Sequence, residues 1–417
     1  MRHKGFTKKE ILNIYHNMFS SRYLDEKQLI LLKQGKGFFH IGSSGHEACE
    51  TAASMVFNTK VDYFYPYYRD QAFCMGLGMT AKEIILSFLA KKDDPNSSGR
   101  QMPQHYGHKD LGIVSQSSPT GTQFLQAVGA GFSIMRDNTK GVVYVSSGEG
   151  TTSQGDFHEA LNWASREKAP VVFHIEDNGY AISVPLGDQV SGGSVYDISS
   201  GYNNLSRYLI DGTDFFESYI AFKKAVEDAR KGKGPSIIVS KVVRLLPHSS
   251  SDDHSKYRSQ EDLKADLDYD PLVKFEKFMV KNNILSVKAI DSFKSKIVEE
   301  IDSYAEWGLD QEDPSSDSAM ENILCIDEFE YKDPSYVSNE KVVMVDQINH
   351  ALDEELNYND KMIIYGQDVA DGKGGVFTVT RGLSTKYGET RVFNSPLAES
   401  SIIGTAVGLA TLGYKPV

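Results

Sequence analysis

The sequence predicts an α/β fold in which a parallel sheet is flanked by helices. Residues 141–147 form a short apolar run of strand length that ends at a glycine-rich turn, and residues 171–175 form a second buried run. Between these runs, the apolar residues of 157–164 recur at helical spacing, and Pro170 ends the helix. Strand, crossover helix and strand make a βαβ unit, whose strands are parallel and whose two turns lie at the same edge of the sheet.

The totals of the chain limit its class. Its 417 residues predict two or more domains, and 40% hydrophobic with 24% charged residues is typical of a globular protein. A formal net charge of −13 without a basic stripe argues against nucleic acid as a partner. Cys49, Cys74 and Cys325 have neither zinc-site nor disulfide spacing, which suits a reducing compartment. No apolar run reaches the roughly 18 residues of a membrane span and no signal peptide is seen, so we expect a cytoplasmic protein without membrane contact.

The first helix is predicted to begin at Thr7, because Thr7 and Glu10 have the spacing of a capping box ahead of an amphipathic run. A second helix start follows residues 39–45 and places His46 and Glu47 in or beside its first turn. A helix start alone accounts for these two side chains. A catalytic role for them is the less favoured alternative.

The elements after the βαβ unit follow the same signals. Residues 211–214 cap a helix that runs through Ala229, and residues 237–243 form another buried strand. Two amphipathic helices are predicted within 270–307. Residues 308–340 are acidic with little periodicity, which indicates a linker.

The two turns of the βαβ unit carry oxygen ligands. Glu149 lies between Gly148 and Gly150, where glycine permits a tight turn and the close approach of an anion, and Asp177 and Asn178 follow the second strand. Carboxylates, side-chain amides and loop carbonyls are the hard ligands that Mg²⁺ uses when it is shared with phosphates. A tight turn without a ligand is the alternative, which the joint spacing of the two turns disfavours.

This pattern, GEG-x26-DNGYAIS, resembles the thiamine-diphosphate motif of the decarboxylating first component of 2-oxoacid dehydrogenase complexes. Most thiamine enzymes have Asp where Glu149 stands, and the Glu variant is similar to the branched-chain 2-oxoacid enzymes. The resemblance implies a thiamine-diphosphate-binding fold, with Mg²⁺ held by Glu149, Asn178 and the main-chain oxygen of Tyr180. It implies cofactor contacts from Tyr68, Arg69, Ser118, Thr120, Gly148, Glu149, Gly150, Thr151, Asn178, Tyr180 and His248.

Two segments before the unit carry the same resemblance. YPYYRDQ (65–71) is similar to the family's YR(D/E) element, in which the arginine binds the diphosphate, as the fork of a guanidinium suits. Taken alone, Arg69 is typical of a surface or stacked arginine. RQMPQHYG (100–107) resembles the branched-chain enzymes and implies that His105 faces the substrate.

Two further loops extend the match. SSPTGTQ (117–123) resembles the element that touches the cofactor and, in branched-chain enzymes, binds potassium, here through Ser117, Pro119, Thr122 and Gln123. Hydroxyls and carbonyls that bond one another are the alternative. The loop 244–259 is similar to an HSTSDD-type loop and implies that His248 reaches the cofactor. Ser249 matches a site phosphorylated in mitochondrial relatives, although the sequence alone does not show a kinase acting here.

From Lys341 the chain resembles the start of the β subunit of the same enzyme, its pyrimidine-binding domain. SPLAE is similar to the family's T-P-I-S-E-type element, which implies that Glu399 activates the cofactor by sharing a proton with its aminopyrimidine. An isolated glutamate at a helix start is typical of a cap. Gln367 replaces a glutamate of the family's GE(D/E)V turn, which puts a proton path between sites in doubt.

We therefore expect an α-subunit-like diphosphate-binding domain over 1–307, an acidic linker over 308–340, and the truncated start of a β-subunit-like domain over 341–417. The resemblance predicts a few hundred further residues, so we interpret the sequence as the amino-terminal part of a fused α–β enzyme. Because the family's site lies between an α-type half and the β-type half of another protomer, a homodimer of fused chains (α2β2-like) is expected.

The function implied is the oxidative decarboxylation of a 2-oxo acid, as in branched-chain amino acid catabolism, with acyl transfer to the lipoyl group of a dihydrolipoyl transacylase partner. Glu399, His248 and His105 are the implied catalytic residues. The motifs favour a branched acid of the 3-methyl-2-oxobutanoate type, and pyruvate or acetoin dehydrogenase components are the alternatives. A non-catalytic assembly or regulatory module and transketolase-like sugar chemistry are the alternatives of other classes.

Overall fold

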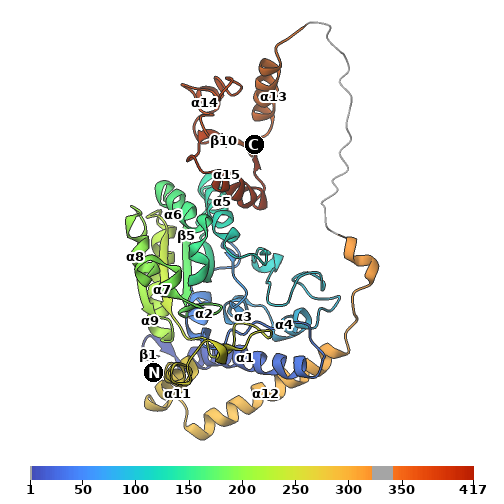
Figure 1. Ribbon diagram of the computed structural model, residues 1–417, viewed down its shortest axis with the longest axis vertical. Helices are drawn as coiled ribbons and strands as arrows, with labels where there is room; N and C mark the ends of the chain where they lie inside the picture. The colour runs from blue at the N-terminus through green and yellow to red at the C-terminus, as the bar shows by residue number, and fades with distance from the viewer. Residues whose placement is uncertain (1, 322–340) are drawn as a thin grey trace. The chain divides into compact units, whose positions relative to one another are not determined.

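The computed structural model describes residues 2–321 and 341–417 (Figure 1). Most of the predicted linker, 322–340, and with it Cys325, lies outside the described residues. The chain divides into two compact units, Met1–Pro314 and Ser315–Val417. No helix in the described ranges is long and apolar enough to cross a membrane.

The first unit is built on a five-stranded parallel sheet with the strand order β3-β4-β5-β9-β8. Its central strand β5 is labelled in Figure 1. Its strands are β3 (Tyr63–Tyr65), β4 (Val143–Gly148), β5 (Val171–Asp177), β8 (Ser206–Asp211) and β9 (Ser236–Lys241). The predicted βαβ unit is confirmed: α6 (Gly155–Glu167) connects β4 to β5, and Lys168 ends it in the left-handed conformation. Gly148 is in register with Glu176, so both turns after these strands lie at one edge of the sheet.

Helices cover both faces of this sheet. On one face, Phe124 of α5 (Thr122–Arg136) lies 5.3 Å from Phe157 of α6 and 6.2 Å from Phe173 of β5, measured between ring centroids. On the other face, Phe73 of α3 (Gln71–Leu77) stacks on Tyr144 of β4 at 4.0 Å. The other helices of this second layer are α2 (Glu47–Ser54) and α9 (Phe215–Arg230). The result is a three-layer α/β/α arrangement with its core on either side of the sheet.

Long helices surround this centre. The predicted capping box is confirmed in α1 (Lys8–Lys33), where the Thr7 hydroxyl accepts from the Glu10 N–H and the Glu10 carboxylate accepts from the Thr7 N–H. The two amphipathic helices predicted within 270–307 are α11 (Pro271–Lys281) and α12 (Val287–Leu309). Helix α12 passes the expected end at 307, because Gly308 packs closely against Ile85 of α4 (Ala81–Phe88).

The remaining elements of the first unit are short. They are β1 (Arg2–His3), β2 (Phe6–Thr7), β6 (Tyr180–Ala181), β7 (Val184–Pro185), α7 (Leu186–Gln189), α8 (Val195–Ile198) and α10 (Gln260–Asp268), with five 3₁₀ turns at Lys109–Leu111, Glu149–Ser153, Ser191–Gly193, Ser199–Gly201 and His254–Lys256.

The second unit contains a small parallel sheet with the order β11-β10-β12. Its elements are a 3₁₀ turn (Ser316–Met320), α13 (Met344–Tyr358), β10 (Met362–Gly366), α14 (Leu383–Tyr387), β11 (Val392–Asn394), α15 (Glu399–Thr411) and β12 (Lys415–Pro416). Leu356, Ile364 and Val392 belong to its own small apolar core. Glu399 is the first residue of α15.

Candidate active site

The turn after β4 continues directly into a 3₁₀ turn over Glu149–Ser153. A side chain at Gly150 would place its Cβ 2.4 Å from the Cβ of Ala181, in the hairpin of β6 and β7. Only glycine therefore lets the Glu149 turn lie against this hairpin. The close approach fixes Glu149 beside Asn178 and Tyr180.

Glu149 is a buried carboxylate with one satisfied oxygen. Its Oε2 accepts the Asn178 N–H at 3.2 Å, and its Oε1 has no hydrogen-bond donor within the described residues. Burial, and secondly the negative charge of Asp177, raise the pKa of Glu149 to about 8. A cation at the free oxygen would relieve both effects, so the side chains present fit a divalent metal.

The second turn orients its own polar groups. The Asn178 side-chain oxygen accepts the Tyr180 N–H at 3.3 Å, and Asp177 Oδ1 accepts the Gly179 N–H at 3.1 Å. Lys241 of β9 forms an ion pair with the other oxygen of Asp177. Asp177 is thus already paired with a cation, whereas Glu149 forms no ion pair with any residue that the structure describes.

A buried arginine lies at the other side of the site. Arg69 donates from Nη1 to the Gly42 carbonyl at 2.6 Å, and from Nη2 to the carbonyl and to Nδ1 of His248 at 2.9 and 3.0 Å. Burial, then the positive charges of Arg69 and Arg244, lower the pKa of His248 to about 4. His248 is therefore neutral near pH 7, and because Nδ1 accepts from Arg69, its proton is on Nε2.

A second histidine, His105, comes from the long loop before α5. His105 Nδ1 lies 3.1 Å from the Pro103 carbonyl, and its Nε2 lies 3.1 Å from the Ser118 hydroxyl. A carbonyl can only accept, so Nδ1 carries a proton and donates it to Pro103, while Nε2 pairs with the Ser118 hydroxyl. The loop thereby fixes the orientation of the imidazole beside that hydroxyl.

The residues predicted for potassium gather in the same loop and bond one another. The Ser117 hydroxyl is 2.9 Å from the Pro119 carbonyl and 2.8 Å from the Thr122 hydroxyl. The Gln123 side-chain oxygen accepts the Gly121 N–H at 2.9 Å. These oxygens lie together, and their mutual bonds are also what a turn without an ion would form.

One cavity of ≈ 560 Å³ collects these groups. It is lined by His105 and by every residue of the first unit that is predicted to touch the cofactor: Tyr68, Arg69, Ser118, Thr120, Gly148, Glu149, Gly150, Thr151, Asn178, Tyr180 and His248. The remaining lining residues are Phe39, Ile41, Tyr67, Met102, Pro119, Gln154, Ala181 and Ile182. The cavity thus offers a carboxylate for a metal, a guanidinium for a phosphate and two imidazoles.

Glu399 belongs to the second unit. It is exposed, and its Oε1 accepts from the Gln367 side-chain amide at 2.9 Å. This hydrogen bond is the main cause that lowers the pKa of Glu399. Gln367, which replaces the expected glutamate, is therefore a direct partner of Glu399.

Behind the cavity lies a buried polar cluster that the motifs do not indicate. Glu176 accepts from Nδ1 of His46 and from the Tyr67 hydroxyl, and burial raises its pKa to about 7. His46 is fully buried and precedes α2 without capping it, so the helix start alone does not account for its side chain, whereas Glu47 accepts the Gly45 N–H at the start of α2 and also accepts from Arg22 at 2.6 Å. Contacts such as His46–Glu176 join residues 130 positions apart, which no local spacing reveals.

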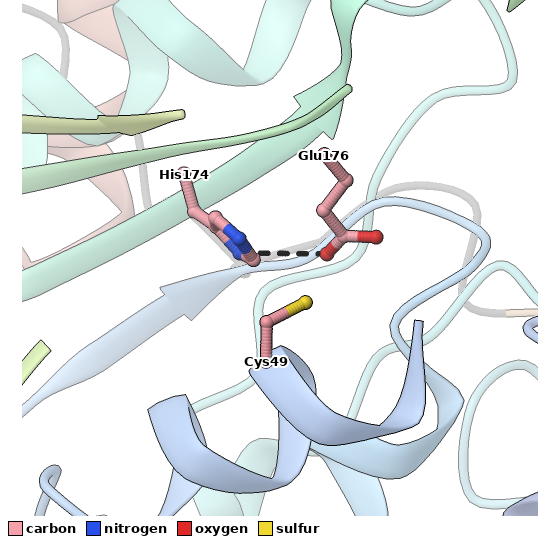
Figure 2. A group of neighbouring side chains, drawn as sticks. All are labelled: Cys49, His174 and Glu176. Atoms are coloured by element: carbon pink, nitrogen blue, oxygen red, sulfur yellow. Dashed lines mark ion pairs between the residues drawn. The ribbon is translucent and has the colours of Figure 1, made fainter. Parts of the chain in front are cut away.

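Figure 2 shows the part of this cluster formed by Cys49, His174 and Glu176. Both ring nitrogens of His174 have other partners, the Tyr144 hydroxyl at 2.9 Å and the Ser240 hydroxyl at 2.8 Å. Burial raises the pKa of the Cys49 thiol, which donates to the His46 carbonyl. Since the imidazole and the thiol are already paired, this group fits a hydrogen-bonded core better than a metal centre.

Comparison with known families gives a consistent result. The model of the dehydrogenase E1 component matches residues 15–313, and the model of the transketolase pyrimidine-binding domain matches residues 340–417. The 2-oxoisovalerate dehydrogenase subunit alpha of Bacillus subtilis is 38% identical over 320 residues, covering 77% of this chain and 96% of that protein.

Mitochondrial proteins are more distant relatives. The 2-oxoisovalerate dehydrogenase subunit alpha 2 of Arabidopsis thaliana is 32% identical over 291 residues, which cover 70% of this chain and 61% of that protein. The subunit alpha of Dictyostelium discoideum is 31% identical over 261 residues, 63% of this chain and 59% of that protein. The matches to these two proteins span about three fifths of their length.

Proposed function

The chain belongs to the dehydrogenase E1 component family, and we propose that it catalyses the oxidative decarboxylation of a branched-chain 2-oxo acid and passes the acyl group to the lipoyl group of a transacylase. The E1 and pyrimidine-binding domains imply thiamine diphosphate as the cofactor. The observation that carries the proposal is the single cavity in which the unpaired Glu149 oxygen, Arg69 and His248 come together.

We assign the metal and diphosphate contacts to the polar end of this cavity. Glu149, Asn178 and the main-chain oxygen of Tyr180 would hold Mg²⁺, because a buried carboxylate without a donor is completed by a cation. Tyr68, Arg69 and the amides of Gly148 to Thr151 would bind the diphosphate, which fits the buried guanidinium. Potassium at Ser117, Pro119, Thr122 and Gln123 is an additional proposal, supported by the gathering of their oxygens.

The bound cofactor supplies a nucleophilic carbon and an electron sink for the decarboxylation. The residues of the chain would then move protons. His248 offers an N–H at Nε2 that can donate to a substrate, and His105 would exchange a proton with the substrate by way of the Ser118 hydroxyl that its Nε2 contacts. Glu399 would share a proton with the aminopyrimidine ring, a role that its position in the pyrimidine-binding half supports.

The proposal includes a division of the chain and a set of partners. Residues 1–307 would form the diphosphate-binding half and residues 341–417 the start of the pyrimidine-binding half, joined by the linker 308–340. A homodimer of fused chains would pass the acyl group to the lipoyl group that the transacylase component carries. The family membership supports the transacylase as the partner.

The test is ferricyanide reduction by the native-length protein with 3-methyl-2-oxobutanoate and with pyruvate, each with and without thiamine diphosphate and Mg²⁺. We expect cofactor-dependent turnover that prefers the branched acid. A Glu149→Ala, Asn178→Ala double variant should lose this activity and bind Mg²⁺–thiamine diphosphate at least about 100-fold more weakly in calorimetry, because two metal ligands are gone.

The matched control is Glu299→Gln, which removes an exposed carboxylate of α12 and should change neither quantity. A preference for pyruvate would keep the reaction and overturn the branched-chain assignment. A parent protein that binds no thiamine diphosphate would overturn the proposed enzyme.

A further inference from the structure

The position of the Arg69 guanidinium is set by two loops. Its Nη1 donates to the carbonyl of Gly42, in the loop before α2, and its Nη2 donates to the carbonyl and to Nδ1 of His248, in the loop after β9. These acceptors carry no formal charge, so the positive charge of the buried guanidinium is left for an anion in the cavity. How well Arg69 meets a diphosphate therefore depends on how firmly the two loops are held.

A buried carboxylate of α1 holds the first loop. Asp25 is fully buried, and its Oδ2 accepts the Ser43 N–H and the Ser44 hydroxyl, both at 2.8 Å. Its Oδ1 accepts from Nε2 of His40 at 3.1 Å. Groups on both sides of Gly42 in the chain therefore converge on one side chain, and these donors offset the cost of burying a carboxylate.

Gly42 itself lies in a narrow gap. An added side chain at Gly42 would place its Cβ 2.6 Å from Cδ1 of Leu246 and 3.4 Å from Oδ2 of Asp25. Leu246 belongs to the loop that carries His248. Only glycine therefore lets the chain pass between α1 and this second loop, and the Gly42 carbonyl is fixed in relation to both.

His40 joins the first loop to the second. Its N–H donates to the Ser250 hydroxyl at 3.2 Å, and its carbonyl accepts the Ser250 N–H at 2.8 Å. Ser250 lies two residues after His248 in the chain. Through His40, the Asp25 carboxylate therefore braces both loops whose carbonyls accept from Arg69.

Asp25 and His40 are not among the residues that line the cavity, so any effect on a bound ligand must pass through Arg69 and the two loops. Resting on the proposed function, we propose that Asp25 and His40 are positioning residues that hold the Arg69 guanidinium ready for the diphosphate of the cofactor. A guanidinium that is fixed in advance loses less conformational entropy when it binds. The pair thereby strengthens diphosphate binding without a contact of its own.

The test measures, by calorimetry, the affinity of the native-length protein for inorganic diphosphate and for thiamine diphosphate, each with saturating Mg²⁺. Asp25→Asn preserves the shape of the side chain but replaces one acceptor oxygen by a donor, so a donor of the first loop loses its partner. We expect both affinities to fall by about 10-fold or more, because a small displacement of a binding group is costly. Inorganic diphosphate is the sharper probe, since it consists only of the group that Arg69 would bind.

Two substitutions of His40 test the pair without changing a carboxylate, and they decide the proposal if Asp25→Asn does not fold. His40→Leu removes the ring N–H that Asp25 accepts, whereas His40→Gln retains a side-chain N–H. Both retain the backbone groups that bond Ser250. We expect His40→Leu to weaken the binding of inorganic diphosphate by about 10-fold and His40→Gln to retain most of the parental affinity.

A double-mutant cycle separates positioning from a general loss of structure. In the background Arg69→Ala, Asp25→Asn should change the affinity for inorganic diphosphate by less than about twofold, because no guanidinium is left to position. A loss that is as large in the Arg69→Ala background as in the parent would overturn the positioning role.

Asp62→Asn is the matched control. Asp62 is also a buried carboxylate that accepts two backbone N–H groups and pairs with Arg230, and it is not among the residues that line the cavity. The substitution should lower the melting temperature, because a buried donor loses its partner. The affinities for inorganic diphosphate and for thiamine diphosphate should remain parental.

The two ligands distinguish a failure of the pair from a failure of the proposed function. Parental affinity for inorganic diphosphate in both Asp25→Asn and His40→Leu would overturn the positioning role and leave the enzyme standing. A parent that binds inorganic diphosphate but no thiamine diphosphate would overturn the proposed enzyme and leave the positioning role standing. A parent that binds neither would overturn both.

Discussion

At the scale of single residues, the members of the candidate site were predictable where they belong to short motifs. Glu149 and Asn178 were proposed as ligands from the spacing of the two turns, and the structure brings both to one cavity with Arg69. The surroundings of Glu149 were not predictable, because they depend on distant partners. The ion pair of Asp177 with Lys241, 64 residues away, and the burial of Glu149 are properties of the packed sheet.

The first prediction concerns the charge of Glu149 in the protein without metal or cofactor. Its pKa is about 8 in the folded chain and near 4.3 in the unfolded chain, so the folded state binds the proton more tightly. The protonated Glu149 carboxyl therefore contributes stability to the folded state. This contribution is complete below the pKa of the unfolded chain and is lost as the pH rises through about 8. We expect the free energy of unfolding, measured by urea denaturation, to fall between pH 5 and pH 8.5 by more in the parent than in Glu149→Gln. The extra loss in the parent should be about 1.4 kcal/mol for each unit by which folding raises the pKa of Glu149.

Other buried carboxyls, such as Glu176, also have raised pKa values, so only the difference between parent and Glu149→Gln reports on Glu149. In the background Asp177→Asn this difference should shrink, because the charge of Asp177 is the second cause of the raised pKa. Saturating Mg²⁺ and thiamine diphosphate should abolish it, since a bound cation replaces the proton. Parallel curves for parent and variant would contradict the assignment.

At the scale of elements, the central strands and the long helices were predicted because their apolar pattern is sustained over many residues. The edge strand β3 has three residues, too few for an alternating pattern, and was not foreseen. The same holds for the two-residue hairpin strands β6 and β7. That hairpin is nevertheless decisive for the site, because it lies against the Glu149 turn.

The hairpin contact can be tested at Gly150. Gly150→Ala places a methyl group 2.4 Å from the Ala181 Cβ, so the hairpin must move away and carry Tyr180 with it. We expect the affinity for Mg²⁺–thiamine diphosphate, measured by calorimetry, to fall by about 10-fold or more, since a ligand displaced by about 1 Å loses most of its bond. The melting temperature should change little, because the hairpin is at the edge of the unit.

Gly155→Ala is the matched control for this substitution. Gly155 opens α6, and an added Cβ meets no atom within 4 Å. The change should leave cofactor affinity intact and stabilise the protein by up to about 1 kcal/mol, because alanine favours the helix. Parental affinity in Gly150→Ala would show that the hairpin does not set the metal site.

At the scale of the whole molecule, the sequence predicted two halves from two separate resemblances, and the matches to the E1 component over 15–313 and to the pyrimidine-binding domain over 340–417 agree with that division. The burial of the polar cluster behind the cavity could not be predicted. Its carboxyls include Glu50, Asp70 and Glu176, and burial raises the pKa of all three. Buried carboxyls of this kind are arranged by tertiary packing, and no composition or period signals them.

The final prediction tests the homodimer of fused chains through complementation. Glu149 and Glu399 lie in different halves of the chain, and in the proposed dimer one active site takes each half from a different protomer. Chains carrying Glu149→Ala and chains carrying Glu399→Gln should each be nearly inactive. In a mixed dimer, one site would contain both substitutions and the other neither. Random exchange of two variants in a symmetric dimer should therefore recover about a quarter of the parental activity.

Exchange is verified by mass spectrometry of differently tagged chains. Mixed dimers without activity would show that each chain completes its own site, and sedimentation at the mass of one chain would refute the dimer itself.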